Sequence, residues 1–143
     1  MRIRPMTAAD APAVADLTTQ LGYPAGADET RSRLALLDAR PDDHAVLVAD
    51  EDGRAVGWVH VALYTSLESG CAASLGGLVV DEAQRSGGIG AELLAAAEAW
   101  AREHGARRLV VRSRVTRERA HRFYEREGYE LVKTSHVFEK PLV

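Results

Sequence analysis

The stretch from Leu78 to Gly90 holds the residues whose types and spacing point most directly to chemistry. It reads Leu-Val-Val-Asp-Glu-Ala-Gln-Arg-Ser-Gly-Gly-Ile-Gly, an apolar strand that runs into a glycine-rich turn and then into a helix. The first N–H groups of a helix have no intrahelical partner and carry the positive end of the helix dipole. A glycine turn at this place lets an anion approach the backbone, so the pattern predicts a phosphate-binding turn.

Two familiar phosphate-binding loops do not fit this turn. No lysine follows Gly90, which excludes the loop of the nucleotide triphosphatases. Leu93 stands where the dinucleotide fingerprint requires a third small residue. The remaining pattern is Arg85-x-x-Gly88-x-Gly90, for which a turn of purely structural role stays an alternative when spacing alone is considered.

A second set of residues lies on a predicted helix over residues 118–126. Helical spacing places Arg117, Ala120 and Tyr124 along one face, so a tyrosine hydroxyl lies over a groove with an alanine floor. The alternative is that Phe123 and Tyr124 are ordinary core aromatics. The order of the two motifs, about 30 residues apart, makes that alternative less favourable.

Both motifs resemble the GCN5-related N-acetyltransferase (GNAT) superfamily, and the chain is most similar to its small bacterial single-domain members. The glycine turn resembles the pyrophosphate loop of that superfamily, and the helix resembles its Asn-x-x-Ala-x-x-x-Tyr helix. Arg117 stands where many members carry asparagine, and the strand from Ser74 to Val79 lacks their common catalytic glutamate. The resemblance implies transfer of the acetyl group of acetyl-CoA to a primary amine of a small molecule or peptide, by direct attack in a ternary complex.

The resemblance also implies a set of donor-site residues. A bulge at Gly76-Gly77 is expected to aim the N–H of Leu78 or Val79 at the thioester carbonyl. Tyr124 is the expected catalytic partner of the leaving thiolate. The residues expected to bind acetyl-CoA are Leu78, Val79, Val80, Arg85, Ser86, Gly87, Gly88, Ile89, Gly90, Ala91, Arg117 and Tyr124.

The general base and the acceptor site are predicted from one strand and two loops. Alternation places Trp58, His60 and Tyr64 on one face of a strand, and Glu68 follows in the next loop. His60 or Glu68 could accept a proton from the amine, directly or through water, although a structural role for each remains an alternative. Trp58, Tyr64 and the loop residue Tyr23 are the candidate walls of the acceptor site.

Two other functions remain open on the sequence. One is a catalytically silent acyl-CoA-binding regulatory domain, which the departures at Arg117 and the central strand favour. The retained Tyr124 and the intact glycine turn argue against it. The other is transfer of a longer acyl group, which depends on the depth of a cleft that the sequence does not describe.

Composition limits the class of protein. The 143 residues, 46% hydrophobic and 27% charged, fit one soluble globular domain over residues 1–143. No apolar run approaches a membrane span and no signal peptide is evident, so a cytoplasmic protein with no membrane partner is expected. The lone Cys71 excludes an internal disulfide, the histidines show no metal-ligand spacing, and a net charge of −3 disfavours nucleic acid. A homodimer through the C-terminal strands is expected by family analogy alone.

The elements that must position these residues alternate between strand and helix. The resulting fold class is α+β, with a mixed, mostly antiparallel central sheet flanked by helices on both faces, as in the GNAT acyl-CoA N-acyltransferase fold. Helices are predicted over residues 7–20, 27–39, 88–104 and 118–126. Strands are predicted over residues 2–5, 45–49, 55–64, 72–80 and 109–112, with an Asp52-Gly53 hairpin turn and two further strands in residues 129–142.

Overall fold

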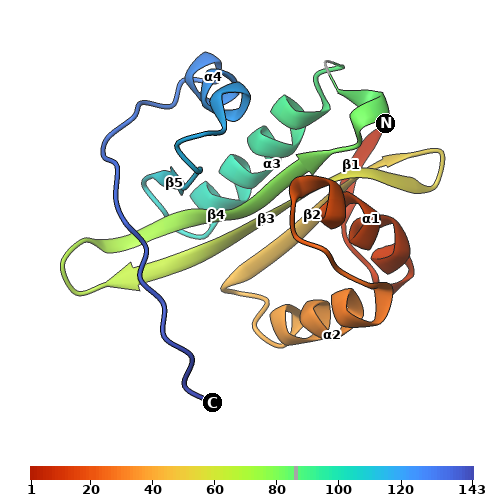
Figure 1. Ribbon diagram of the computed structural model, residues 1–143, viewed down its shortest axis with the longest axis horizontal. Coiled ribbons are helices and arrows are strands. Elements are labelled where there is room, and N and C mark those ends of the chain that lie inside the picture. The colour runs from red at the N-terminus through yellow and green to blue at the C-terminus, as the bar shows by residue number, and fades with distance from the viewer. Residues whose placement is uncertain (86) are drawn as a thin grey trace. The chain divides into compact units, whose positions relative to one another are not determined.

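A computed structural model describes residues 1–85 and 87–143, which form two compact units, Met1–Val111 and Arg112–Val143. The first unit contains a five-stranded sheet in the order β1-β2-β3-β4-β5 (Figure 1). All neighbours pair antiparallel except β4 and β5, which are parallel. The predicted mixed, mostly antiparallel sheet is therefore confirmed. Its strands are β1 (Arg2–Pro5), β2 (His44–Glu51), β3 (Arg54–Ser66), β4 (Gly70–Val80) and β5 (Leu109–Val111).

Helices cover both faces of this sheet. After the short 3-10 turn η1 (Ala8–Asp10), helices α1 (Ala11–Leu21) and α2 (Ala27–Asp38) lie on one face, and α3 (Ile89–Glu103) lies on the other (Figure 1). A second 3-10 turn, η2 (Glu82–Gln84), follows β4. Each helix buries its apolar stripe: Val14 and Leu34 join a core cluster with Val48, while Leu93 of α3 is fully buried.

The turn between β2 and β3 has the geometry that its sequence predicts. Asp52 and Gly53 have φ values of 54° and 86°, the left-handed pair of a two-residue hairpin turn. Farther along the hairpin, Val56 has no partner in β2, because Asp50 pairs with Ala55 and Ala49 pairs with Gly57. Every later pair of β2 and β3 is therefore shifted by one residue.

Arg4 on β1 ties the first strand to two neighbouring elements through its guanidinium group. Nη1 and Nη2 donate to the two carboxylate oxygens of Asp10 at 2.8 Å each, and Nε donates to Asp50 at 2.7 Å. Asp10 also accepts a hydrogen bond from the backbone N–H of Thr7 at 2.8 Å, so this N–H group has a partner in the turn after β1. The pKa of Asp10 lies below its ordinary value, chiefly because of the hydrogen bonds from Arg4.

We expect Asp10→Asn to lower the free energy of unfolding at neutral pH by about 2 kcal/mol, because it removes charged hydrogen bonds from a buried carboxylate. Since the pKa of Asp10 is lowered, its contribution is present above pH 3.8 and is lost as the pH falls through the folded-state pKa. Urea titrations of wild type and variant should differ at neutral pH and converge in acid.

The exposed Asp16 provides a matched control for Asp10. Asp16→Asn makes the same chemical change on the surface of α1 and should alter the free energy of unfolding by less than about 0.5 kcal/mol. Equal losses in the two variants, or a loss for Asp10→Asn that does not shrink as the pH is lowered below 3.8, would show that the charged Asp10 carboxylate does not stabilise the fold through Arg4.

The second unit contains helix α4 (Glu118–Arg126), with the bounds that the sequence predicts. The prediction of two strands in residues 129–142 is wrong, because residues 129–143 have no regular secondary structure. Alternating apolar residues indicate a strand, but a strand also needs a partner for its N–H and C=O groups. Val137 and Phe138 are 88% and 91% exposed.

Among the described residues, every helix is too short or too polar to span a bilayer.

Candidate active site

The second half of β4 has one free edge within the Met1–Val111 unit. Strand β5 pairs only with Ala73–Leu75, whereas β4 continues to Val80. Its other edge is paired with β3 along its length. In the described part of this unit, the edge of residues 76–80 that faces away from β3 is left without a strand partner. A free edge of this kind can hydrogen-bond an extended ligand as if it were an added strand.

A bulge lies where this free edge begins. His60 pairs with Gly77 and Val61 pairs with Leu75, so Gly76 has no partner in β3. This confirms the predicted bulge at the glycine pair. A Cβ atom on Gly76 would lie 2.5 Å from His60 Nδ1, and a Cβ atom on Gly77 would lie 2.6 Å from the Trp58 ring. Glycine is required at both positions because the two rings lie directly over them.

His60 is paired with a second histidine that the sequence does not single out. His60 Nε2 lies 3.1 Å from Nδ1 of His44 on β2. Burial, and secondarily the charge of His44, holds the pKa of His60 below its ordinary value. His60 is therefore neutral at neutral pH and can accept a proton beside the bulge.

The predicted phosphate-binding turn connects the end of β4 to α3. Gly88 caps α3 with a left-handed φ of 84°, and the first helical bond runs from the Glu92 N–H to the Gly88 carbonyl. The N–H groups of residues 89–91 precede that first bond, so they have no partner within the helix and can donate to an anion. Arg85 Nε donates to the Val80 carbonyl at 3.3 Å, which folds its side chain back toward the strand. The predicted donor residue Ser86 lies outside the described residues.

Tyr124 lies on α4 in the second unit. Its ring makes an edge contact with Tyr129, with 5.8 Å between the ring centroids. Burial raises the pKa of Tyr124, and the charge of Arg117 partly opposes that effect. Arg117 itself is the N-cap residue of α4. Tyr124 therefore carries its proton at neutral pH and can donate a hydrogen bond.

The remaining predicted residues lie at several distances from the bulge. Glu68 is at the exposed tip of the β3–β4 hairpin, about 20 Å along the strand from His60. The structure does not bring Glu68 and the bulge together. Tyr64 is exposed on β3, and Tyr23 is exposed in the α1–α2 loop. Leu21 at the end of α1 lies 3.8 Å from the Cβ position of Gly77, which places that loop beside the glycine pair.

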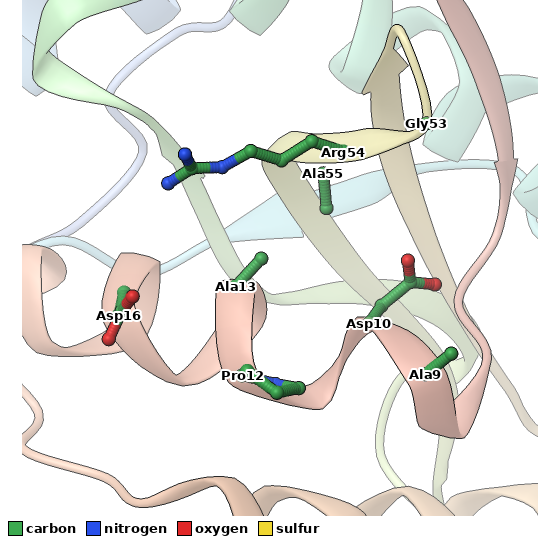
Figure 2. Close-up of a pocket in the computed structure, with 8 residues that line it drawn as sticks. All are labelled: Ala9, Asp10, Pro12, Ala13, Asp16, Gly53, Arg54 and Ala55. Atoms are coloured by element: carbon green, nitrogen blue, oxygen red, sulfur yellow. The ribbon is translucent and has the colours of Figure 1, made fainter.

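A hollow of about 400 Å³ lies elsewhere in the Met1–Val111 unit, between the start of α1 and the β2–β3 hairpin (Figure 2). Of its two carboxylates, Asp10 and Asp16, the first already accepts hydrogen bonds from Arg4. The hollow contains none of the residues that the sequence predicts for the site. Its lining residues are Ala9, Asp10, Pro12, Ala13, Asp16, Gly53, Arg54 and Ala55.

Comparison with known proteins places the chain among the acetyltransferases. The model of the acetyltransferase (GNAT) family matches residues 12–129. The chain belongs to the GNAT family. This GNAT protein is therefore an acetyl-CoA-dependent N-acetyltransferase, as the two sequence motifs predict.

Individual relatives of this GNAT enzyme agree with that assignment. The aminoglycoside N(6')-acetyltransferase type 1 of Stenotrophomonas maltophilia is 34% identical, over 98% of this chain and 93% of that protein. The uncharacterized N-acetyltransferase YhfO of Bacillus subtilis is 31% identical, over 91% of this chain and 90% of that protein. The crystal structure of an aminoglycoside 6'-N-acetyltransferase from Acinetobacter haemolyticus has the same fold, with a TM-score of 0.86 at 19% identity over the whole of both chains.

Proposed function

We propose that this enzyme transfers the acetyl group of acetyl-CoA to a primary amine of a cationic small molecule, by direct attack in a ternary complex. The observation that carries the proposal is the free edge of β4, which runs from the Gly76 bulge to the glycine turn before α3. This single element offers strand-like hydrogen bonds at one end and an anion site at the other. The aminoglycoside-modifying relative at 34% identity supports a small-molecule acceptor.

The proposed donor site uses the backbone for most of its contacts. Residues 78–80 pair with the pantetheine arm, and the N–H of Leu78 donates to the thioester carbonyl as negative charge develops there. The Asp81 N–H donates to the Val56 carbonyl at 2.8 Å, so strand alternation turns the N–H of Val79 toward β3 and the N–H of Leu78 toward the free edge. The turn and the first residues of α3 hold the pyrophosphate. Arg117 is a further proposed cofactor-binding residue. The donor residues in the turn are Arg85, Ser86, Gly87, Gly88, Ile89, Gly90 and Ala91.

Tyr124 is the proposed partner of the leaving thiolate. A tyrosine with a pKa of about 10 and a thiol with a pKa of about 8.5 make full proton transfer unfavourable by about 2 kcal/mol. Burial raises the pKa of Tyr124 further, so transfer is less favourable still. A hydrogen bond that strengthens as charge develops on sulfur is therefore the favoured role.

The acceptor requires most of the chemical assistance. Deprotonating an alkylammonium group with a pKa of about 10.4 at pH 7 costs about 4.6 kcal/mol of free energy. The proposed walls against which such an amine is held are Trp58, whose ring lies over Gly77, and the exposed Tyr64 and Tyr23. Desolvation against aromatic side chains favours the neutral amine that must attack.

A panel of amines with detection of released thiol tests the acceptor class. We expect thiol release with aminoglycosides that carry a 6'-amine, and none with matched analogues that carry a hydroxyl group at that position. Aliphatic polyamines, amino sugars and peptides with free N-termini form the other arms. Thiol release with peptides alone would show that the acceptor is a peptide and not a small molecule. No thiol release with any of these amines would refute the proposed transfer.

The order of events has its own expected result. Direct attack predicts intersecting initial-rate plots when both substrates are varied, and no acetylated protein when acetyl-CoA is added without an acceptor. Parallel rate plots together with a mass increase of one acetyl group would indicate a covalent acetyl-enzyme instead. Mass spectrometry of the intact protein measures that difference directly.

A further inference from the structure

We infer that His60 accepts the proton that the attacking amine sheds, and that His44 is a positioning residue that keeps His60 in the tautomer able to do so. This inference rests on the proposed amine acetylation. It also assigns a role to His44, a residue that neither the spacing nor the motifs of the sequence indicate.

The geometry of the two rings supports this pairing. His44 Nδ1 and His60 Nε2 are 3.1 Å apart, and the ring centroids are 5.3 Å apart. The other ring nitrogen of His60, Nδ1, faces the Cβ position of Gly76 at the bulge. His60 therefore connects the point where the free edge of β4 begins to a second imidazole on β2.

The tautomer follows from which nitrogen carries the hydrogen. If His44 Nδ1 accepts, His60 carries its proton on Nε2 and presents the bare lone pair of Nδ1 toward the bulge. In the opposite arrangement His44 donates, and His60 Nδ1 carries a proton and cannot act as a base. The inference requires the first arrangement.

The chemical step balances with these two rings. The nitrogen lone pair of a neutral amine forms the new C–N bond, and the C–S bond breaks with its electron pair on sulfur. One N–H bond of the attacking nitrogen breaks as a new N–H bond forms at His60 Nδ1. The resulting imidazolium keeps its Nε2–H bond to His44 and later releases its proton to water. Because the nitrogen becomes acidic as the C–N bond forms, a base with a low pKa is sufficient.

The surroundings of His60 leave His44 as its main electrostatic partner. Gly76 on β4, over which the His60 ring lies, is uncharged. Among the described residues, the charge of His44 is the only one that shifts the pKa of His60, and it acts in the same direction as burial. The lowered pKa keeps His60 unprotonated to pH values below 6.5.

Nitrogen-15 NMR of the full chain without substrate tests the tautomer. We expect the two-bond proton–nitrogen correlations of His60 to show a protonated Nε2 and a bare Nδ1. His44→Asn places an amide oxygen near the position of the lost Nδ1 acceptor and should preserve that pattern. His44→Leu should lose it. A wild-type spectrum with the proton on His60 Nδ1 would overturn the inference.

Steady-state kinetics with the best acceptor tests the chemical role. His60→Gln should lower kcat roughly 50-fold and remove the acid limb of the kcat profile, because water then takes the proton less efficiently. His44→Leu should lower kcat about 10-fold, and His44→Asn should restore it to within about threefold of wild type. In His44→Asn the acid limb should move to higher pH, because asparagine cannot take up the positive charge by which a histidine at this position lowers the pKa of His60.

Control variants separate failure of this inference from failure of the proposed function. His104→Leu removes a histidine whose Nδ1 lies 2.9 Å from the Trp100 carbonyl at the end of α3, and should leave kcat unchanged. If the wild type acetylates amines, and His60→Gln unfolds in a normal cooperative thermal transition and retains kcat, the assignment of His60 as the base is wrong while the proposed function stands. If the wild type releases no thiol with any amine, the function fails and the base assignment fails with it.

Discussion

Replacing Tyr124 with phenylalanine is expected to lower kcat about 500-fold while the Kd for acetyl-CoA changes by less than about threefold. The hydroxyl of a half-buried tyrosine is the group that the substitution removes. Its proposed hydrogen bond to sulfur is weak when the sulfur is part of a thioester and strong when it is a thiolate. The loss therefore falls on the transition state rather than on ground-state binding.

Stopped-flow or steady-state turnover, together with calorimetric titration of acetyl-CoA, measures the two quantities separately. Tyr129→Phe is the matched control, because it removes the same hydroxyl from a ring in edge contact with Tyr124. It should retain wild-type turnover. An unchanged kcat in Tyr124→Phe would remove this residue from the chemistry, and equal losses in both variants would indicate a structural effect on the second unit.

Replacing Gly88 with valine is expected to raise the Kd for acetyl-CoA about 100-fold. The φ of Gly88 is 84°, a left-handed conformation that a β-branched residue rarely adopts. The chain would relieve the strain by rotating the turn, and this would redirect the N–H groups proposed to hold the pyrophosphate. Gly88→Ala, with less strain, should show an effect about tenfold smaller.

Gly105 provides a matched control at the other end of the same helix. Its φ is 85°, and a Cβ atom there, as at Gly88, would have nothing within 4 Å. Gly105→Val should therefore lower the thermal midpoint about as much as Gly88→Val without weakening CoA binding. Equal losses of affinity in the two variants would mean that strain anywhere in α3 is responsible, and retained affinity in Gly88→Val would exclude the turn from donor binding.

Much of the fold could be predicted because its elements depend on residues close in the chain. The Asp52-Gly53 turn requires two positive φ values, which favours these residue types at that place. Helix α4 begins and ends at the residues predicted, since Gly128 with a φ of 94° follows its last turn. The bulge at Gly76 was also predicted, because adjacent glycines inside a strand indicate a close approach.

The C-terminal segment shows where local pattern is insufficient. Residues 129–142 alternate as a strand would, yet the structure gives them no ladder partner. Strand propensity reflects how well a residue packs on a sheet that already exists. A segment of high strand propensity therefore forms no strand unless a neighbouring strand is present to pair with it. Glu68 shows the same limit for a site residue. It follows His60 by eight positions in the sequence, but an extended strand carries it to the far tip of the hairpin.

The sequence by itself predicted the donor half of the proposed site, because a glycine turn at a helix start and a glycine pair in a strand act through the backbone of the residues themselves. Only the tertiary structure brought His44 to His60. A regular hairpin built on the Asp52-Gly53 turn would pair His60 with Ala45 and would place His44 on the opposite face of the sheet. The unpaired Val56 shifts the register so that His60 pairs with Val46, and both imidazoles then lie on one face. One extra residue in a strand moves every later side chain of that strand to the opposite face of the sheet. The position of such a residue depends on how the side chains pack on both faces.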